Sequence, residues 1–115
     1  FQKKVTIKNS YLRNASFNFS YFLGGLVIEN CIFDKYLDFE AGGHNDSGSI
    51  VIRNNQFKGF VNFFDCWFTG EVYIKGNVFD KGTNICSNNQ LVSSDIPMRL
   101  ALNAGELTIE SECKN

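Results

Sequence analysis

The stretch from Ile50 to Asn89, written in elevens, reads IVIRNNQFKGF, VNFFDCWFTGE, VYIKGNVFDKG and TNICSNN. Large apolar residues recur in it at an interval of 11, in two columns that alternate. The chain therefore presents a large apolar side chain every five or six residues. A helix would need spacings of three and four, and a flat strand would need spacings of two. The pattern predicts a parallel β-solenoid, in which each side of a coil turns one large side chain inward. The first column is Ile52, Phe63, Ile74 and Ile85, and the second is Phe57, Phe68 and Phe79.

Similar sequence segments recur towards the N-terminus, and their spacing gives the length of one coil. The segments are VTIKNSYL at 5–12, LVIENCIF at 26–33, IVIRNNQF at 50–57 and VYIKGNVF at 72–79. Their key isoleucines, at positions 7, 28, 52 and 74, are separated by 21, 24 and 22 residues, a period typical of solenoids. We expect one all-β domain over residues 1–115, with four to five coils of about 22 residues between 5 and 89.

Further columns predict the corners and the outer surface. Asn and Gly tolerate positive φ, so the column Asn9, Asn30, Asn54 and Gly76 predicts a left-handed corner. Stacked Asn side chains at this corner could bond to one another and to turn backbone. Two outward columns and a second set of corner glycines complete the coil. The outward charged column is Lys8, Glu29, Arg53 and Lys75, the outward β-branched and aromatic stripe is Thr6, Val27, Val51 and Tyr73, and the other corners are at Gly59, Gly70 and Gly82.

Two regions depart from the repeat. Residues 41–49, AGGHNDSGS, lack periodicity and predict a loop inserted into a coil. His44 with Asp46 and Asp38 could form an acid–base or metal cluster, but we favour a solvated turn. In residues 90–115, which we expect to form a C-terminal cap, Ser94, an early Pro and a Gly at 105 predict a short helix, followed by a last strand at Leu107–Glu110. The N-terminal end shows no cap, so a partner or an upstream segment is expected to cover it.

The four cysteines do not form a disulfide framework. Cys31 and Cys66 each precede a core Phe by two residues and are expected to be buried thiols. Cys86 and Cys113 could pair in an oxidising compartment. With one His and no CxxC spacing, neither a zinc site nor another cofactor is expected.

Net charge and hydropathy limit the classes of partner that the sequence predicts. The net charge is −1, from 11 basic and 12 acidic residues, so no nucleic-acid surface is expected. No apolar run approaches the roughly 20 residues that span a bilayer, so we expect a soluble chain. The sequence begins at Phe1, which leaves both a cytoplasmic and, after signal removal, an extracytoplasmic location open.

The run FKGFVNFFDCWFTGEVYIKGNVF, residues 57–79, resembles the pentapeptide-repeat family. A small residue two before a large central one matches best at Cys66 and Phe68, and the likeness extends loosely over residues 5–85. The phrase I-x-N-N-x-F at Ile52 is also similar to the repeats of pectate-lyase-like β-helices. Both resemblances imply a right-handed parallel β-helix. They differ in whether the cross-section is square or three-sided.

The pentapeptide-repeat resemblance implies a non-catalytic structural or protein-interaction module. It would bind a protein partner or a second copy of itself through a solenoid end or an outward face. The stripe that contains Thr6, Val27, Val51 and Tyr73 is a candidate interaction face. Ordinary exposed strand residues with no binding role would give the same sequence pattern. A DNA-mimicking role would need a strongly acidic surface, which a net charge of −1 does not supply.

The alternative is a carbohydrate-binding or carbohydrate-active β-helix. Tyr21, Phe64 and Trp67 are aromatic residues expected to face solvent, where they could serve as platforms for sugar rings. No carboxylate pair recurs along one face at the spacing that glycoside chemistry needs, so catalysis is not expected.

Overall fold

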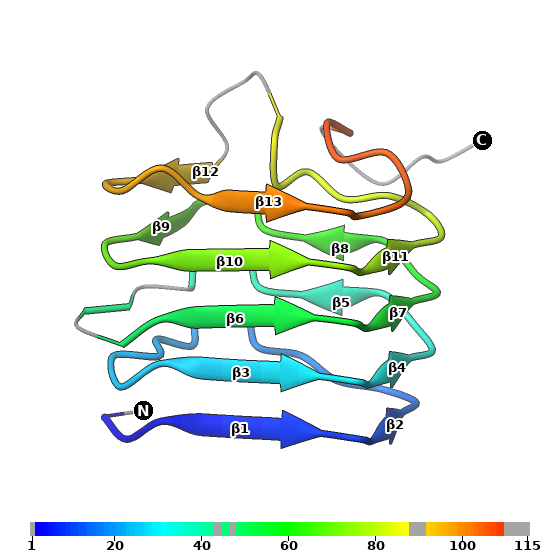
Figure 1. Cartoon of the computed structure of the whole chain (residues 1–115), viewed down its shortest axis with the longest axis horizontal. Coiled ribbons are helices and arrows are strands. Elements are labelled where there is room, and N and C mark those ends of the chain that lie inside the picture. The colour runs from blue at the N-terminus through cyan, green and yellow to red at the C-terminus, as the bar shows by residue number, and fades with distance from the viewer. Residues whose placement is uncertain (1, 43–44, 47, 88–91, 110–115) are drawn as a thin grey trace.

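The computed structural model describes residues 2–42, 45–46, 48–87 and 92–109. In these residues the chain is an all-β parallel solenoid of about four turns, with no helix (Figure 1). The first sheet contains β1 (Val5–Lys8), β3 (Leu26–Glu29), β6 (Ile50–Arg53), β10 (Val72–Lys75) and β13 (Arg99–Ala101), in that order. The second contains β2 (Tyr11–Leu12), β4 (Ile32–Phe33), β7 (Gln56–Phe57) and β11 (Val78–Phe79). Two smaller sheets pair β5 (Leu37–Asp38) with β8 (Val61–Asn62) and β9 (Cys66–Phe68) with β12 (Val92–Ser94).

The register follows the sequence columns. Ile7, Ile28, Ile52 and Ile74 are successive partners across the first sheet, and all of its strand pairs are parallel. The coil that starts at Ile50 passes through β6, β7, β8 and β9 before β10 begins the next one. Four strand segments in one coil match a four-sided cross-section rather than a three-sided one. In Figure 1 the chain runs from left to right along β6 at the front, turns at β7, and returns from right to left along β8 at the back. Because each coil lies above the preceding one, this path is a right-handed coil.

Phenylalanine rings stack along the axis and fill the core. Ring centroids lie 5.2 Å apart for Phe33 and Phe57, 5.0 Å for Phe57 and Phe79, and 4.9 Å for Phe39 and Phe63. These distances are close to the roughly 4.8 Å between neighbouring strands, so the coil spacing itself brings the rings into contact. The two columns predicted from the 11-residue interval are therefore confirmed as core.

The predicted left-handed corner is confirmed. Asn9, Asn30 and Asn54 have φ of 50°, 56° and 57°, and Gly76 has 69°. The ladder of amide bonds, however, forms one residue later than expected, because the corner turns that next side chain inward. In this inner column the Asn77 side chain accepts the Asn55 N–H at 3.0 Å and donates to the Ile52 carbonyl at 2.9 Å. The column runs through Cys31, Asn55, Asn77 and Asn103.

A second left-handed corner was missed by sequence reasoning. Phe19, Ala41 and Asp65 have φ of 57°, 55° and 59°, and they lie on successive coils. Residue types that favour this conformation mark the first corner, but they do not mark the second. Of the other glycines proposed as corners, Gly82 has φ of +80°, whereas Gly59 and Gly70 are outside the left-handed region.

The predicted insertion at 41–49 contains no strand in its described residues. It is nevertheless anchored. Asn45 is fully buried, its side chain accepts the Gly70 N–H at 3.0 Å and donates to the Gly48 carbonyl at 2.8 Å. His44 lies outside the described residues, so the cluster with Asp46 and Asp38 remains a hypothesis.

The predicted helix near the C-terminus is wrong. Arg99–Ala101 forms β13, which pairs with β10 so that Leu100 lies over Ile74. Asn103 then extends the inner amide column. Pairing with β10 outweighs the local preference for a helix, because the upper edge of β10 would otherwise leave backbone groups unpaired. The same segment also extends the core and the amide column. The last strand predicted at Leu107–Glu110 is also absent from its described part, 107–109.

No helix in the described residues is long and apolar enough to cross a membrane.

Candidate functional site

The outward stripe is aligned as predicted, but it offers little open surface. Thr6, Val27, Val51 and Tyr73 are successive partners across the first sheet. Only Thr6 is exposed, whereas Val51 and Tyr73 are half-buried and Val27 is 8% exposed. Arg99 covers the Tyr73 ring at 5.5 Å from the centroid. The stripe is therefore more shielded than the sequence suggested.

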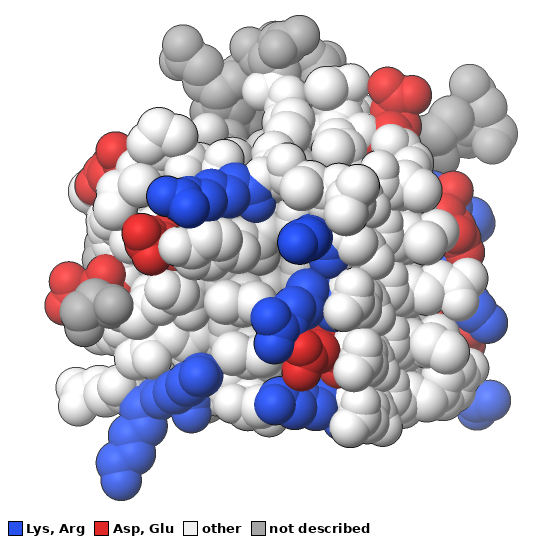
Figure 2. All heavy atoms as spheres, in the orientation of Figure 1, with Lys and Arg blue, Asp and Glu red and all other residues white. Residues whose placement is uncertain are grey.

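The charged column forms an ion-pair ladder. Glu29 lies between Lys8, at 3.6 Å, and Arg53, whose Nε donates to its carboxylate. The hydrogen bond from Arg53, with the charges of both cations, lowers the pKa of the Glu29 carboxyl. Such exposed pairs are worth little stability, and the ladder mainly favours one register. Figure 2 shows this alternation of blue and red near the lower end of the first sheet.

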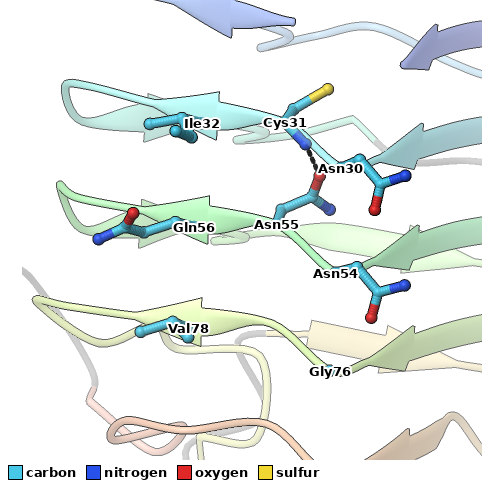
Figure 3. Close-up of a pocket in the computed structure, with 8 residues that line it drawn as sticks. All are labelled: Asn30, Cys31, Ile32, Asn54, Asn55, Gln56, Gly76 and Val78. Atoms are coloured by element: carbon cyan, nitrogen blue, oxygen red, sulfur yellow. Dashed lines mark hydrogen bonds between the residues drawn. The ribbon is translucent and has the colours of Figure 1, made fainter. Parts of the chain in front are cut away.

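A shallow groove of about 430 Å³ lies along the first corner. Figure 3 shows the amides of Asn30 and Asn54 pointing outward, while Asn55 accepts the Cys31 N–H at 2.8 Å. The inward-facing amides of Asn55 and Asn77 donate hydrogen bonds to backbone carbonyls of the neighbouring coils. The groove is thus the outer wall of a structural corner, where the amides of Asn30 and Asn54 and the side chains of Ile32 and Val78 face solvent.

A smaller hollow of about 330 Å³ lies at the second corner. Three of its lining side chains are large exposed aromatics: Phe19 is 69% exposed, Tyr21 52% and Trp67 51%. The other lining residues are Ala41, Gly42 and Asp65. The sequence had singled out Tyr21 and Trp67 separately, and the fold brings them to one hollow. Phe64 is exposed as expected, at 44%, but is not among the lining residues.

The corner geometry explains why these rings meet. Phe19 and Asp65 occupy equivalent left-handed positions two coils apart, and Tyr21 and Trp67 each follow two residues later. Ala41 takes the same position on the coil between them. Gly42 follows it, and a Cβ there would lie 2.6 Å from the Ser20 carbonyl oxygen, so only Gly fits. Ala41 and Gly42 are the residues of the middle coil that line the hollow.

Polar contacts hold the upper wall of the hollow. The Trp67 Nε1–H donates to Asp95 Oδ1 at 2.9 Å, which joins β9 to the turn after β12. The Ala41 N–H donates to the Phe64 carbonyl at 2.9 Å, and the Phe19 N–H to the Glu40 carbonyl at 2.8 Å. These bonds tie four successive coils together around the hollow.

The N-terminal end of the solenoid exposes part of the core. Ile7 and Leu12 are half-buried, whereas their partners one coil later, Ile28 and Phe33, are at most 1% exposed. β1 bonds to β3 along one edge, and no described strand lies along its other edge (Figure 1).

Two of the three described cysteines are buried in the core. Cys31 and Cys66 are buried, as predicted, and Cys66 Sγ contacts the Phe39 carbonyl at 2.9 Å. Burial raises the pKa of the Cys66 thiol to about 12. Cys86 is half-buried, while Cys113 lies outside the described residues, so their pairing is untested. The part of the chain that the structure describes holds no group of three or more His, Cys, Asp or Glu placed to bind a metal.

Comparison of the chain with protein-family models, with curated proteins and with solved structures gave no match.

Proposed function

We propose that this chain is a non-catalytic, pentapeptide-repeat-like protein-interaction module, and that its N-terminal end receives the partner. The single observation that carries the proposal is the difference between equivalent residues of the first two coils. Ile7 and Leu12 are half-buried at the end, and Ile28 and Phe33 are completely covered. A solenoid end that exposes apolar side chains and a strand edge is suited to accept another strand.

The charges at this end favour an acidic partner over a second copy. The first 28 residues contain Lys3, Lys4, Lys8 and Arg13 and no acidic residue. Two copies that met through this end would bring two such sets of cations together, which costs free energy. An extended segment that alternates acidic and apolar residues would instead cover the core end and neutralise the lysines.

The register of β1 identifies the atoms that such a strand would use. The Val5 N–H donates to the Gly25 carbonyl at 3.0 Å, and the Asn9 N–H to the Glu29 carbonyl at 3.0 Å. In a parallel ladder alternate residues bond to the same side, so the Thr6 N–H points to the open edge. A Thr6→Pro substitution removes this donor and leaves the bonds to β3 in place, as proline at an open edge strand does.

The test is binding of a labelled peptide that alternates valine and glutamate, followed by fluorescence anisotropy. We expect the wild-type chain and Thr6→Val to bind it, Thr6→Pro to bind it weakly, and a valine–lysine peptide not to bind. Equal binding by Thr6→Pro and Thr6→Val would refute strand addition at β1. Sedimentation of the purified chain supplies the second measurement: a dimer that Thr6→Pro dissociates would replace the acidic partner with a second copy.

A further inference from the structure

The outer face of the second sheet exposes a column of mainly apolar side chains. Its members, successive partners across β2, β4, β7 and β11, are Tyr11, Ile32, Gln56 and Val78. Figure 3 shows the last three one above another on successive strands. Tyr11 is 57% exposed, Ile32 38% and Val78 42%, whereas the outward stripe of the first sheet is mostly shielded. Of the two large sheets, the second therefore offers a partner the more open apolar column.

A column of charged side chains runs beside the apolar one. The residues that directly follow the four strands are Arg13, Asp34, Lys58 and Asp80, of which Asp34 is half-buried and the others are exposed. The N–H groups of Asp34, Lys58 and Asp80 each donate to a carbonyl of the preceding coil at 2.9 Å, which keeps the column in register. Each residue lies two positions after the apolar column and so faces the same side. Gln56 Nε2 donates to Asp80 Oδ2 at 3.1 Å, which joins the two columns.

The charges of this column alternate in sign and are not paired with one another. On the first sheet Glu29 pairs with Lys8 and Arg53, and these are the ion pairs found among the residues that the structure describes. From the N-terminal coil onward the second column reads positive, negative, positive, negative. Turned end over end, the same column reads negative, positive, negative, positive. It is therefore complementary in charge to a reversed copy of itself.

We propose that the chain forms an antiparallel homodimer through the outer face of the second sheet. The two-fold axis runs along the strands, so each column faces its own reversed copy, as in an isologous interface. Arg13 then faces Asp80 of the second copy. Asp34 faces Lys58 of the second copy, and the symmetry repeats both pairs. A parallel arrangement that superposed the two columns, or a slip of one coil, would place like charges opposite each other, which costs free energy.

The apolar column supplies the affinity, and the charges set the orientation. In this arrangement Tyr11 covers Val78 of the second copy, and Ile32 lies over the methylene groups of Gln56. Four coils at roughly 4.8 Å and four residues at roughly 3.3 Å give a face of roughly 300 Å². A standard stable interface has about 800 Å² per partner, so we expect a weak dimer with a dissociation constant of roughly 10 µM to 1 mM. This surface differs from the N-terminal end, and the proposal does not depend on the function proposed there.

Sedimentation equilibrium of the intact chain, at concentrations from roughly 10 µM to 1 mM, measures the dissociation constant. We expect Lys58→Glu and Asp34→Lys each to raise it by about tenfold or more, because each brings two pairs of like charges together. An equimolar mixture of the two variants should restore about the wild-type value. In the mixed dimer the introduced carboxylate of one variant faces the introduced ammonium of the other. Lys75→Glu makes the same change in net charge on the first sheet, and this matched control should dimerise like the wild type.

Far-UV circular dichroism checks that the variants fold. If one does not, the wild-type chain supplies a second measurement: its dissociation constant should rise with sodium chloride, because salt screens exposed ion pairs. The proposal is overturned if the chain stays monomeric at every concentration, if neither charge reversal weakens the dimer, if the mixture does not restore it, or if salt leaves it unchanged. A dimer that Thr6→Pro dissociates and Lys58→Glu does not would place self-association at the N-terminal end instead.

Discussion

The inner amide ladder offers the most direct test of how the corner is held. Asn77 is 1% exposed and makes four side-chain hydrogen bonds. Its Oδ1 accepts the backbone and side-chain N–H groups of Asn55, each at 3.0 Å. Its Nδ2 donates to the Ile52 carbonyl at 2.9 Å and to Asn103 Oδ1 at 3.0 Å. The substitution Asn77→Ala removes all four bonds.

The cost can be estimated from the groups left behind. The Asn55 backbone N–H is buried and loses its partner, which costs about 1–3 kcal/mol. The other three bonds contribute roughly 0.5–1.5 kcal/mol each, although the Asn55 and Asn103 side chains and the Ile52 carbonyl keep or can find other partners. We expect Asn77→Ala to lower the free energy of unfolding by roughly 3 kcal/mol or more, a large part of the stability of a domain of this size.

Urea unfolding measures the loss, followed in parallel by far-UV circular dichroism and Trp67 fluorescence to check that the transition is two-state. The matched control is Asn14→Ala, since Asn14 is exposed and should change stability by less than about 0.5 kcal/mol. If Asn77→Ala were as stable as this control, the amide ladder would not hold the corner.

Three further predictions concern other columns. Gly76→Asn should change the free energy of unfolding by less than about 1 kcal/mol in the same urea assay, because Asn54 has the same left-handed conformation one coil earlier, whereas Gly76→Val should be clearly destabilising. Glu29→Gln should be less stable than the wild type at neutral pH. Because the folded-state pKa of Glu29 is lowered, the difference should disappear as pH falls below the ordinary value of 4.5 and through the lowered one, and a constant gap across that range would contradict the ion-pair ladder. The raised pKa of Cys66 predicts that stability falls as pH rises from about 9 towards 12, and that native-state alkylation modifies Cys86 before Cys66. Peptide mapping would show the order, and early labelling of Cys66 would be inconsistent with its burial.

Much of the solenoid could be predicted because its determinants are periodic. Ile52 and Phe57 recur, as large apolar residues, at the same places in the first four coils, and the strand spacing brings each onto its counterpart. The corner at Asn54 was predictable for a similar reason, since few residue types tolerate its φ. The helix predicted near Pro97 failed because local signals cannot show that the edge of β10 is open and needs a partner.

The candidate sites divide in the same way. Sequence alone determined that Trp67 faces outward, because alternation along a strand sets the side on which its side chain lies, but it did not single out Phe19, which is 69% exposed. Only the tertiary structure decided that Phe19, Tyr21 and Trp67 border one hollow. They come from coils whose separation along the chain is much larger than any local pattern, and the corner that aligns Phe19 with Asp65 has no characteristic residue type. A repeating core can be inferred from short sequence patterns, because each strand carries the same apolar positions. A surface site depends instead on how the coils of the whole solenoid are placed relative to one another.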